Sequence, residues 1–129
     1  MSKILDTSTI TRYLTYDDPK KAEAVRNLLK NPKTELLIPD VIIAELVWLL
    51  GSFYKMTKKN IADRLDGLLA IETLKINRVL ISQTLGIYKS INISWIDAYT
   101  CAIVQLGEAD GIYSYDRGIK VPNVKRLEP

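Results

Sequence analysis

Short apolar segments alternate with longer helical patterns along the whole chain, and this alternation limits its possible folds more than any other feature. Segments typical of strands lie at residues 3–5, 35–38, 111–115 and 123–127, with a weaker one at 72–74. Between them, apolar residues recur at helical spacing over about 9–14, 18–30, 39–54, 57–70, 77–90 and 94–107. Strands separated by helices form parallel sheets that the helices cover on both faces. The sequence therefore predicts an α/β sandwich.

The composition excludes several classes of enzyme. The chain has 129 residues, 47% of them hydrophobic, which suits a single domain spanning residues 1–129. It has no histidine and one cysteine, Cys101, so a histidine-based catalytic triad, a His-ligated zinc site and an internal disulfide are all excluded. The apolar stretches are too short to span a bilayer and the first residues do not read as a signal peptide, so we expect a soluble, cytoplasmic protein. Any catalysis must use carboxylates, hydroxyls or cations.

Four acidic residues stand where elements meet one edge of the predicted sheet. Asp6 directly follows the first strand, and Asp116 directly follows the strand that begins at Gly111. Glu45 lies in the second turn of the helix after the second strand, and Asp97 lies in the first turn of the last helix. Ligands of open α/β sheets bind beyond the carboxyl ends of the strands. We therefore expect these four acids to converge on one rim.

Each acid also has a purely structural explanation. Asp6 can cap the first helix, and Asp40 can cap the helix that carries Glu45. Asp97 follows a serine at capping-box spacing, and Asp116 can be an ordinary turn residue. Glu45 is harder to explain, because its neighbours on both sides are apolar and leave no polar stripe for it. An isolated carboxylate taken out of water is costly unless it is paired, protonated or bound to a metal.

Four unpaired carboxylates on one rim would repel one another, and a divalent cation removes that repulsion. Mg²⁺ and Mn²⁺ bind carboxylate and water oxygens in an octahedral shell. Such a cation polarises a phosphodiester and lowers the pKa of a bound water, so no histidine is needed. Setting aside four of the 15 acidic residues leaves 11 against 18 basic ones, an excess that favours a nucleic-acid substrate. The residues therefore favour metal-assisted hydrolysis of a phosphodiester.

The segments around these acids resemble the four-motif pattern of the PIN domain family. They are Ile4-Leu5-Asp6-Thr7-Ser8, Ile38-Pro39 followed by Glu45, Trp95-Ile96-Asp97-Ala98, and Tyr113-Ser114-Tyr115-Asp116. The short length, the position of Pro39 and the ending from Val124 to Leu127 look most like the VapC-type toxins of VapBC toxin–antitoxin pairs. The resemblance covers nearly the whole chain. It implies a PIN-like three-layer α/β/α sandwich around a central, mostly parallel sheet of about four or five strands.

By this resemblance the protein is an endoribonuclease that uses Mg²⁺, or Mn²⁺ in its place. Its catalytic and metal-binding acids would be Asp6, Glu45, Asp97 and Asp116. A metal-activated water would attack the phosphorus in line and leave 5′-phosphate and 3′-hydroxyl ends, with Glu45 or Asp97 orienting the water. Many relatives carry a further acid two positions after the fourth one, where this chain has Gly118. This departure favours one resident metal, with a second cation arriving with the RNA.

The same resemblance implies supporting residues and partners. Ser8 and Ser114 match small hydroxyl positions that support Asp6 and Asp116 by hydrogen bonding, although many relatives have Asn in place of Ser8. Members of the family cut structured RNAs such as tRNA or rRNA, usually form homodimers, and are silenced by a small VapB-type antitoxin. Aromatic and apolar residues on neighbouring helices are expected to line a groove for an antitoxin helix, with core packing as the alternative. These residues are Tyr13, Leu14, Trp48, Phe53 and Tyr54.

Other functions fit the sequence less well. A catalytically inactive PIN-fold module that binds RNA or protein is the main alternative, and Gly118 motivates it. A haloacid-dehalogenase-type phosphatase needs a second Asp two positions after the first, where this chain has Ser8. A response-regulator receiver needs adjacent acids near the first strand, whereas Asp6 stands alone. None of the six glycines forms part of a nucleotide-binding phosphate loop.

Overall fold

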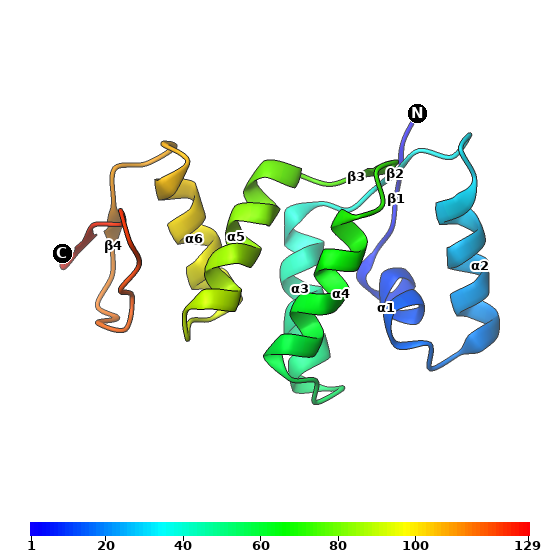
Figure 1. Ribbon diagram of the computed structural model, residues 1–129, viewed down its shortest axis with the longest axis horizontal. Helices are drawn as coiled ribbons and strands as arrows, with labels where there is room; N and C mark the ends of the chain where they lie inside the picture. The colour runs from blue at the N-terminus through cyan, green and yellow to red at the C-terminus, as the bar shows by residue number, and fades with distance from the viewer. The chain divides into compact units, whose positions relative to one another are not determined.

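The computed structural model describes residues 1–129, which fold into six α-helices and five short strands (Figure 1). The chain divides into two compact units, Met1–Asn77 and Arg78–Pro129, each of which is described by itself. None of the helices combines the length and the apolar character that a membrane crossing requires. The alternation of strands and helices confirms the predicted α/β class.

Every predicted helix is present, and its ends lie within about two residues of the predicted ones. The first unit contains β1 (Lys3–Ile4), α1 (Thr7–Thr15), α2 (Pro19–Lys30), β2 (Leu36–Leu37), α3 (Asp40–Ser52), α4 (Lys58–Leu69) and β3 (Leu74–Lys75). The second unit contains α5 (Arg78–Ser90), α6 (Trp95–Gln105), β4 (Ile112–Tyr113) and β5 (Arg126–Leu127). The strands are shorter than the apolar segments that predict them.

All strand pairs are parallel, as the sequence predicts. In the first unit the order is β1-β2-β3, with Lys3 opposite Leu36 and Leu36 opposite Leu74. In the second unit β4 pairs with β5, with Ile112 opposite Arg126. The five strands therefore form a three-stranded sheet and a two-stranded sheet, one in each unit.

One face of each helix supplies the core of its unit. In α3, the buried side chains Ile43, Leu46, Val47 and Leu50 follow helical spacing. They belong to a core that α1 and α4 complete with Ile10, Leu65 and Leu68. The junction of β1 and α1 positions Asp6, and α3 positions Glu45, so this core sets the framework for both acids.

The second unit is built around the packing of α5 against α6. Tyr88 and Trp95 meet edge to face, with ring centroids 5.4 Å apart. Cys101 is fully buried in α6, as expected for a small core residue. Burial, followed by the negative charge of Asp97, raises the pKa of its thiol. The apolar face of α6 thus fixes the helix that presents Asp97.

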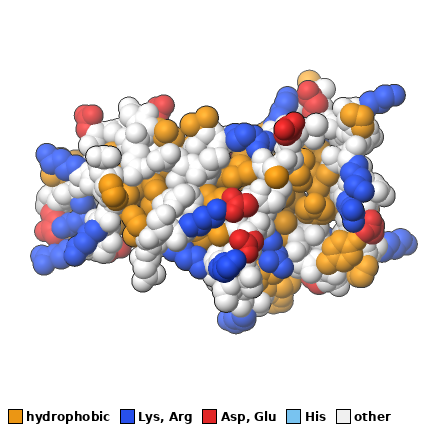
Figure 2. Space-filling view, in the orientation of Figure 1, with side chains coloured by type: hydrophobic (Ala, Val, Ile, Leu, Met, Phe, Trp, Pro, Cys, Tyr) orange, Lys and Arg blue, Asp and Glu red, His pale blue; other side chains and the backbone are white.

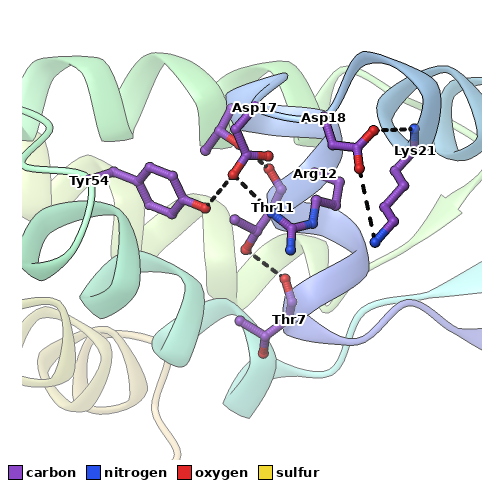
Figure 3. Close-up of polar contacts among 8 residues, drawn as sticks. Thr7, Thr11, Arg12, Asp17, Asp18, Lys21 and Tyr54 are labelled. Carbon is purple, nitrogen blue, oxygen red and sulfur yellow. Dashed lines mark hydrogen bonds and ion pairs between the residues drawn. The ribbon is translucent and has the colours of Figure 1, made fainter.

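Polar contacts secure the turn between α1 and α2 (Figure 3). Arg12 Nη1 and the Tyr54 hydroxyl both donate to Asp17 Oδ2, at 2.8 and 2.9 Å. The hydrogen bond from Tyr54, followed by that from Arg12, lowers the pKa of Asp17, and the same contact with Asp17 raises the pKa of Tyr54. The α1–α2 turn is therefore tied to the residues just after α3.

Candidate functional site

Asp6 is the N-cap of α1. Its Oδ1 accepts a hydrogen bond from the Thr9 N–H at 2.9 Å and another from the Ser8 hydroxyl at 2.9 Å. These bonds, with that from Thr9 the stronger cause, lower the pKa of the Asp6 carboxyl. The residue is exposed, and no hydrogen bond engages Oδ2. Asp6 therefore caps the helix and still keeps one carboxylate oxygen for a ligand.

Two substitutions at Asp6 separate its capping role from its charge. Asn caps a helix about as well as Asp, whereas Ala does not, so Asp6→Ala should lower the free energy of unfolding by about 1 kcal/mol and Asp6→Asn by much less. Because folding lowers the Asp6 pKa, the stabilisation from its charge is present above the ordinary value of 3.8 and is lost as the pH falls through the folded value. Urea denaturation at pH 7 and pH 3 measures both effects. Equal losses for the two variants at pH 7 would contradict the capping role.

Glu45 lies in the second turn of α3 and is exposed. The interpretation that no polar stripe is available for it is wrong. One face of α3 suffices to fill the core, so the row Val41–Glu45–Trp48 is exposed although two of its members are apolar, with Val41 74% and Trp48 67% exposed. No hydrogen bond or ion pair engages the Glu45 carboxylate. It is a free anion on the surface of α3.

Asp97 is the third residue of α6, which Ser94 caps. The backbone N–H of Asp97 donates to Ser94 Oγ at 3.1 Å. The cap therefore uses the backbone of Asp97, and its half-buried carboxylate has no hydrogen bond or ion pair. The capping role and the metal-binding role predicted for Asp97 are therefore compatible, because the cap uses its backbone and leaves its carboxylate unpaired.

Asp116 lies in a tight turn just after β4. Its Oδ1 accepts a hydrogen bond from the Gly118 N–H at 2.8 Å, and its own N–H donates to Ser114 Oγ at 3.0 Å. A Cβ at position 118 would lie 3.0 Å from that same Oδ1. A larger residue at position 118 would therefore require the Asp116 carboxylate to shift, so glycine suits the close approach of this turn.

The four acids divide evenly between the units: Asp6 and Glu45 belong to the first, Asp97 and Asp116 to the second. In the first unit α1 packs against α3, and in the second α6 packs against β4. Within neither unit do three or more Asp, Glu, His or Cys side chains gather into a group that could hold a metal ion. Each of the four keeps at least one carboxylate oxygen without a hydrogen bond, and such oxygens are the ligands that Mg²⁺ and Mn²⁺ prefer. The donor chemistry suits these cations, and convergence on one rim stays a prediction.

Two contacts beside the acids were not predicted. Asn77 Nδ2 donates to Asp40 Oδ2 at 3.2 Å, and Pro39, not Asp40, is the N-cap of α3. Arg126 Nη1 donates to the Ser114 carbonyl at 2.7 Å and so braces the end of β4. Both pairs join residues at least 12 positions apart along the chain, so no local pattern in the sequence indicates them.

The residues predicted to line an antitoxin groove lie in three different environments. Tyr13 and Leu14 line a cavity of about 570 Å³ among α1, α2 and α4. Trp48 and Phe53 do not line it, and at 67% and 71% exposure they do not pack in the core either. Tyr54 is engaged with Asp17. The structure therefore brings together Tyr13 and Leu14 in one cavity, and Phe53 and Tyr54 as a separate pair whose rings meet edge to face with centroids 5.0 Å apart.

The family model of the PIN domain matches residues 3–124, and so extends across both units. No curated protein sequence matches the chain. PIN domains are generally nucleases and typically use divalent metal ions, which agrees with acids whose charges are left unpaired. The extent of the match, together with the parallel α/β fold, places this chain in the PIN domain family.

Proposed function

We propose that this protein is a metal-dependent endoribonuclease, with Asp6, Glu45, Asp97 and Asp116 as the acids that bind Mg²⁺ or Mn²⁺. One observation carries the proposal. None of these four carboxylates forms an ion pair with Lys or Arg, although the chain has 18 basic residues. Unpaired carboxylates at the motif positions of a PIN domain are available to a cation.

The chain's own residues divide the work at such a site. Asp6 is held by Ser8 and the Thr9 N–H, and Asp116 by the Gly118 N–H, so these two carboxylates are fixed in direction before any ligand arrives. Glu45 and Asp97 have no such bonds, which leaves either one able to orient the attacking water. A bound cation would polarise the phosphodiester and lower the pKa of a water molecule. In-line attack on phosphorus then leaves a 5′-phosphate and a 3′-hydroxyl.

The proposed biological role is that of a VapC-type toxin that cuts tRNA or rRNA in the cytoplasm, acts as a homodimer and is neutralised by a VapB-type antitoxin. The cavity that Tyr13 and Leu14 line supports a peptide partner. Its other lining residues include Arg26, Lys30 and Arg64, and no acid lines it. A lining that combines apolar side chains with three cationic ones suits an acidic, amphipathic helix.

Incubation of the purified protein with total cellular RNA tests the proposed reaction. We expect discrete new fragments with Mg²⁺ or Mn²⁺ and none after removal of the metal with EDTA. Adaptors are ligated directly to the 5′ ends of the fragments, and the ligated fragments are sequenced. Direct ligation requires a 5′-phosphate, so it reports whether the new ends carry one. RNA that is bound but never cut with either metal would contradict the nuclease and favour the alternative, a PIN-fold module that only binds RNA.

A further inference from the structure

A second cavity lies along the α1–α2 pair, and its lining begins at Ser8, two residues after Asp6. Its volume is about 410 Å³. Helix α1 contributes Ser8, Thr9 and Arg12 to its lining, and α2 contributes four residues that begin at Lys21 and end at Leu28. Figure 1 shows the two helices side by side, joined by the short turn at residues 16–18. All of these residues belong to the first unit.

Along the axis of α1, the lining changes from hydroxyl side chains to a cationic one. At the end next to Asp6, Ser8 and Thr9 make the two hydrogen bonds that hold its carboxylate. One helical turn further on, about 6 Å along the axis, stands Arg12. The cavity therefore extends from the two residues that hold a candidate metal-binding carboxylate to Arg12, which carries a guanidinium.

The α2 side of the cavity combines an apolar surface with a second cation. Its apolar members are Ala24, Val25 and Leu28, of which Ala24 and Leu28 are exposed. Lys21 lines the same cavity, and no acidic residue does. An apolar surface next to two cations matches a nucleotide, which presents a base and a phosphate together.

Lys21 and Arg12 each contact an aspartate, and both can still bind an anion. Lys21 Nζ lies 3.9 Å from Asp18 in a surface pair, a contact of little strength (Figure 3). Arg12 donates one of its five N–H groups to Asp17, and the other four are available to donate to an anion. Figure 2 shows further Lys and Arg side chains along the α2 edge of this unit, which add to the attraction for a polyanion.

We propose that this groove binds one nucleotide of the RNA, adjacent to the phosphate that is cut, with the base against Ala24 and Leu28 and the next phosphate on Arg12 and Lys21. The inference rests on the proposed function and extends it, because it assigns a substrate-binding subsite to residues outside the four acids. These residues are positioning residues: they hold the RNA, and the acids do the chemistry.

Two matched pairs of variants test the subsite. Ala24→Trp fills the groove, and Asn27→Trp places the same side chain on an exposed part of α2 outside the lining. Lys21→Ala removes a groove cation, and Lys20→Ala removes its exposed neighbour, which does not line the groove. Binding of each variant to a labelled single-stranded oligoribonucleotide is measured by fluorescence anisotropy in the Asp97→Asn background, which keeps the RNA intact. Cleavage by each variant is measured at steady state in the wild-type background.

We expect Ala24→Trp to raise Kd and KM about tenfold with kcat little changed, and Asn27→Trp to change none of them. Loss of one phosphate contact in Lys21→Ala should reduce the slope of log K against log salt concentration by about 0.7, and Lys20→Ala should leave the slope unchanged. Cleavage with unchanged KM and slope in both groove variants would overturn the subsite and leave the nuclease standing. RNA binding that depends on the groove, without cleavage in either metal, would overturn the nuclease and leave the groove as an RNA-binding site.

Discussion

Replacing Asp97 by Asn should reduce RNA cleavage by about 10²- to 10³-fold, the effect of removing one group that stabilises transition-state charge. The substitution removes a free negative charge but keeps the backbone N–H that donates to Ser94 Oγ. The cap of α6 is therefore preserved, and the fold should be unchanged. Initial cleavage rates with saturating Mg²⁺, together with thermal denaturation of both proteins, measure the two effects separately.

Asp110→Asn is the matched control for this prediction. Asp110 is exposed, lies in the same unit just before β4 and belongs to none of the four motif positions. The control variant should cut RNA at the wild-type rate. Expression in cells extends the comparison, since the wild type and Asp110→Asn should arrest growth and Asp97→Asn should not. Equal cleavage by Asp97→Asn and the wild type would remove this residue from the site.

Leu46→Ala should lower the free energy of unfolding by about 2–5 kcal/mol, the largest effect on stability that we expect from a single substitution. Leu46 is fully buried in α3, where its side chain fills the core of the first unit. Truncation removes apolar contacts and leaves a cavity that the surrounding helices can close only in part. Urea denaturation followed by circular dichroism measures the loss as a shift of the midpoint.

Trp48→Ala tests the same helix on its other face. Trp48 is 67% exposed, so its truncation should change the free energy of unfolding by no more than about 0.5 kcal/mol in either direction. The contrast between two apolar residues two positions apart is the sharpest check on how α3 is oriented. A loss for Trp48→Ala as large as that for Leu46→Ala would show that this face of α3 is covered.

The helices could be predicted closely because their signals are local. Asp18-Pro19 and Thr57 mark helix starts through caps whose side chains accept hydrogen bonds from the backbone, and both caps are present. Four of the strands lie within the predicted segments, and β3 extends one residue beyond its segment, to Lys75. All five are shorter than predicted, since an apolar run shows that a segment is buried, not how many of its residues pair. Leu36 pairs with both neighbouring strands, whereas Ile38, which is fully buried, lies outside β2 and keeps only a hydrogen bond from its N–H to the Lys75 carbonyl at 2.9 Å. No local rule separates these two residues.

The exposure of Glu45 shows why sequence alone misleads at an apolar helix. Apolar residues surround it along α3, but a helix buries only the face that meets its neighbours. The apolar content of a helix does not say which face is covered, because that depends on where the other helices pack. The same limit applies to Tyr54, whose hydroxyl bonds to an aspartate 37 positions away.

The acids of the candidate site could be chosen from sequence because each stands at a fixed place relative to a strand or a helix start. The cap formed by Asp6 and its hydrogen bond from Ser8 could also be predicted, but the hydrogen bond that holds Asp116 could not. The Gly118 N–H reaches the Asp116 carboxylate because the turn folds back within two residues. Such a turn depends on backbone angles, and the sequence Asp-Arg-Gly permits several of them.

Burial of the single thiol, Cys101, makes its rate of alkylation a measure of how often the second unit opens. Only a thiolate reacts with alkylating reagents, and Cys101 is both sealed from solvent and held in its protonated form at neutral pH. Modification must therefore wait until local opening of the unit exposes the thiol. The alkylation rate of the native protein consequently measures how often this part of the chain opens, with no engineered reporter residue.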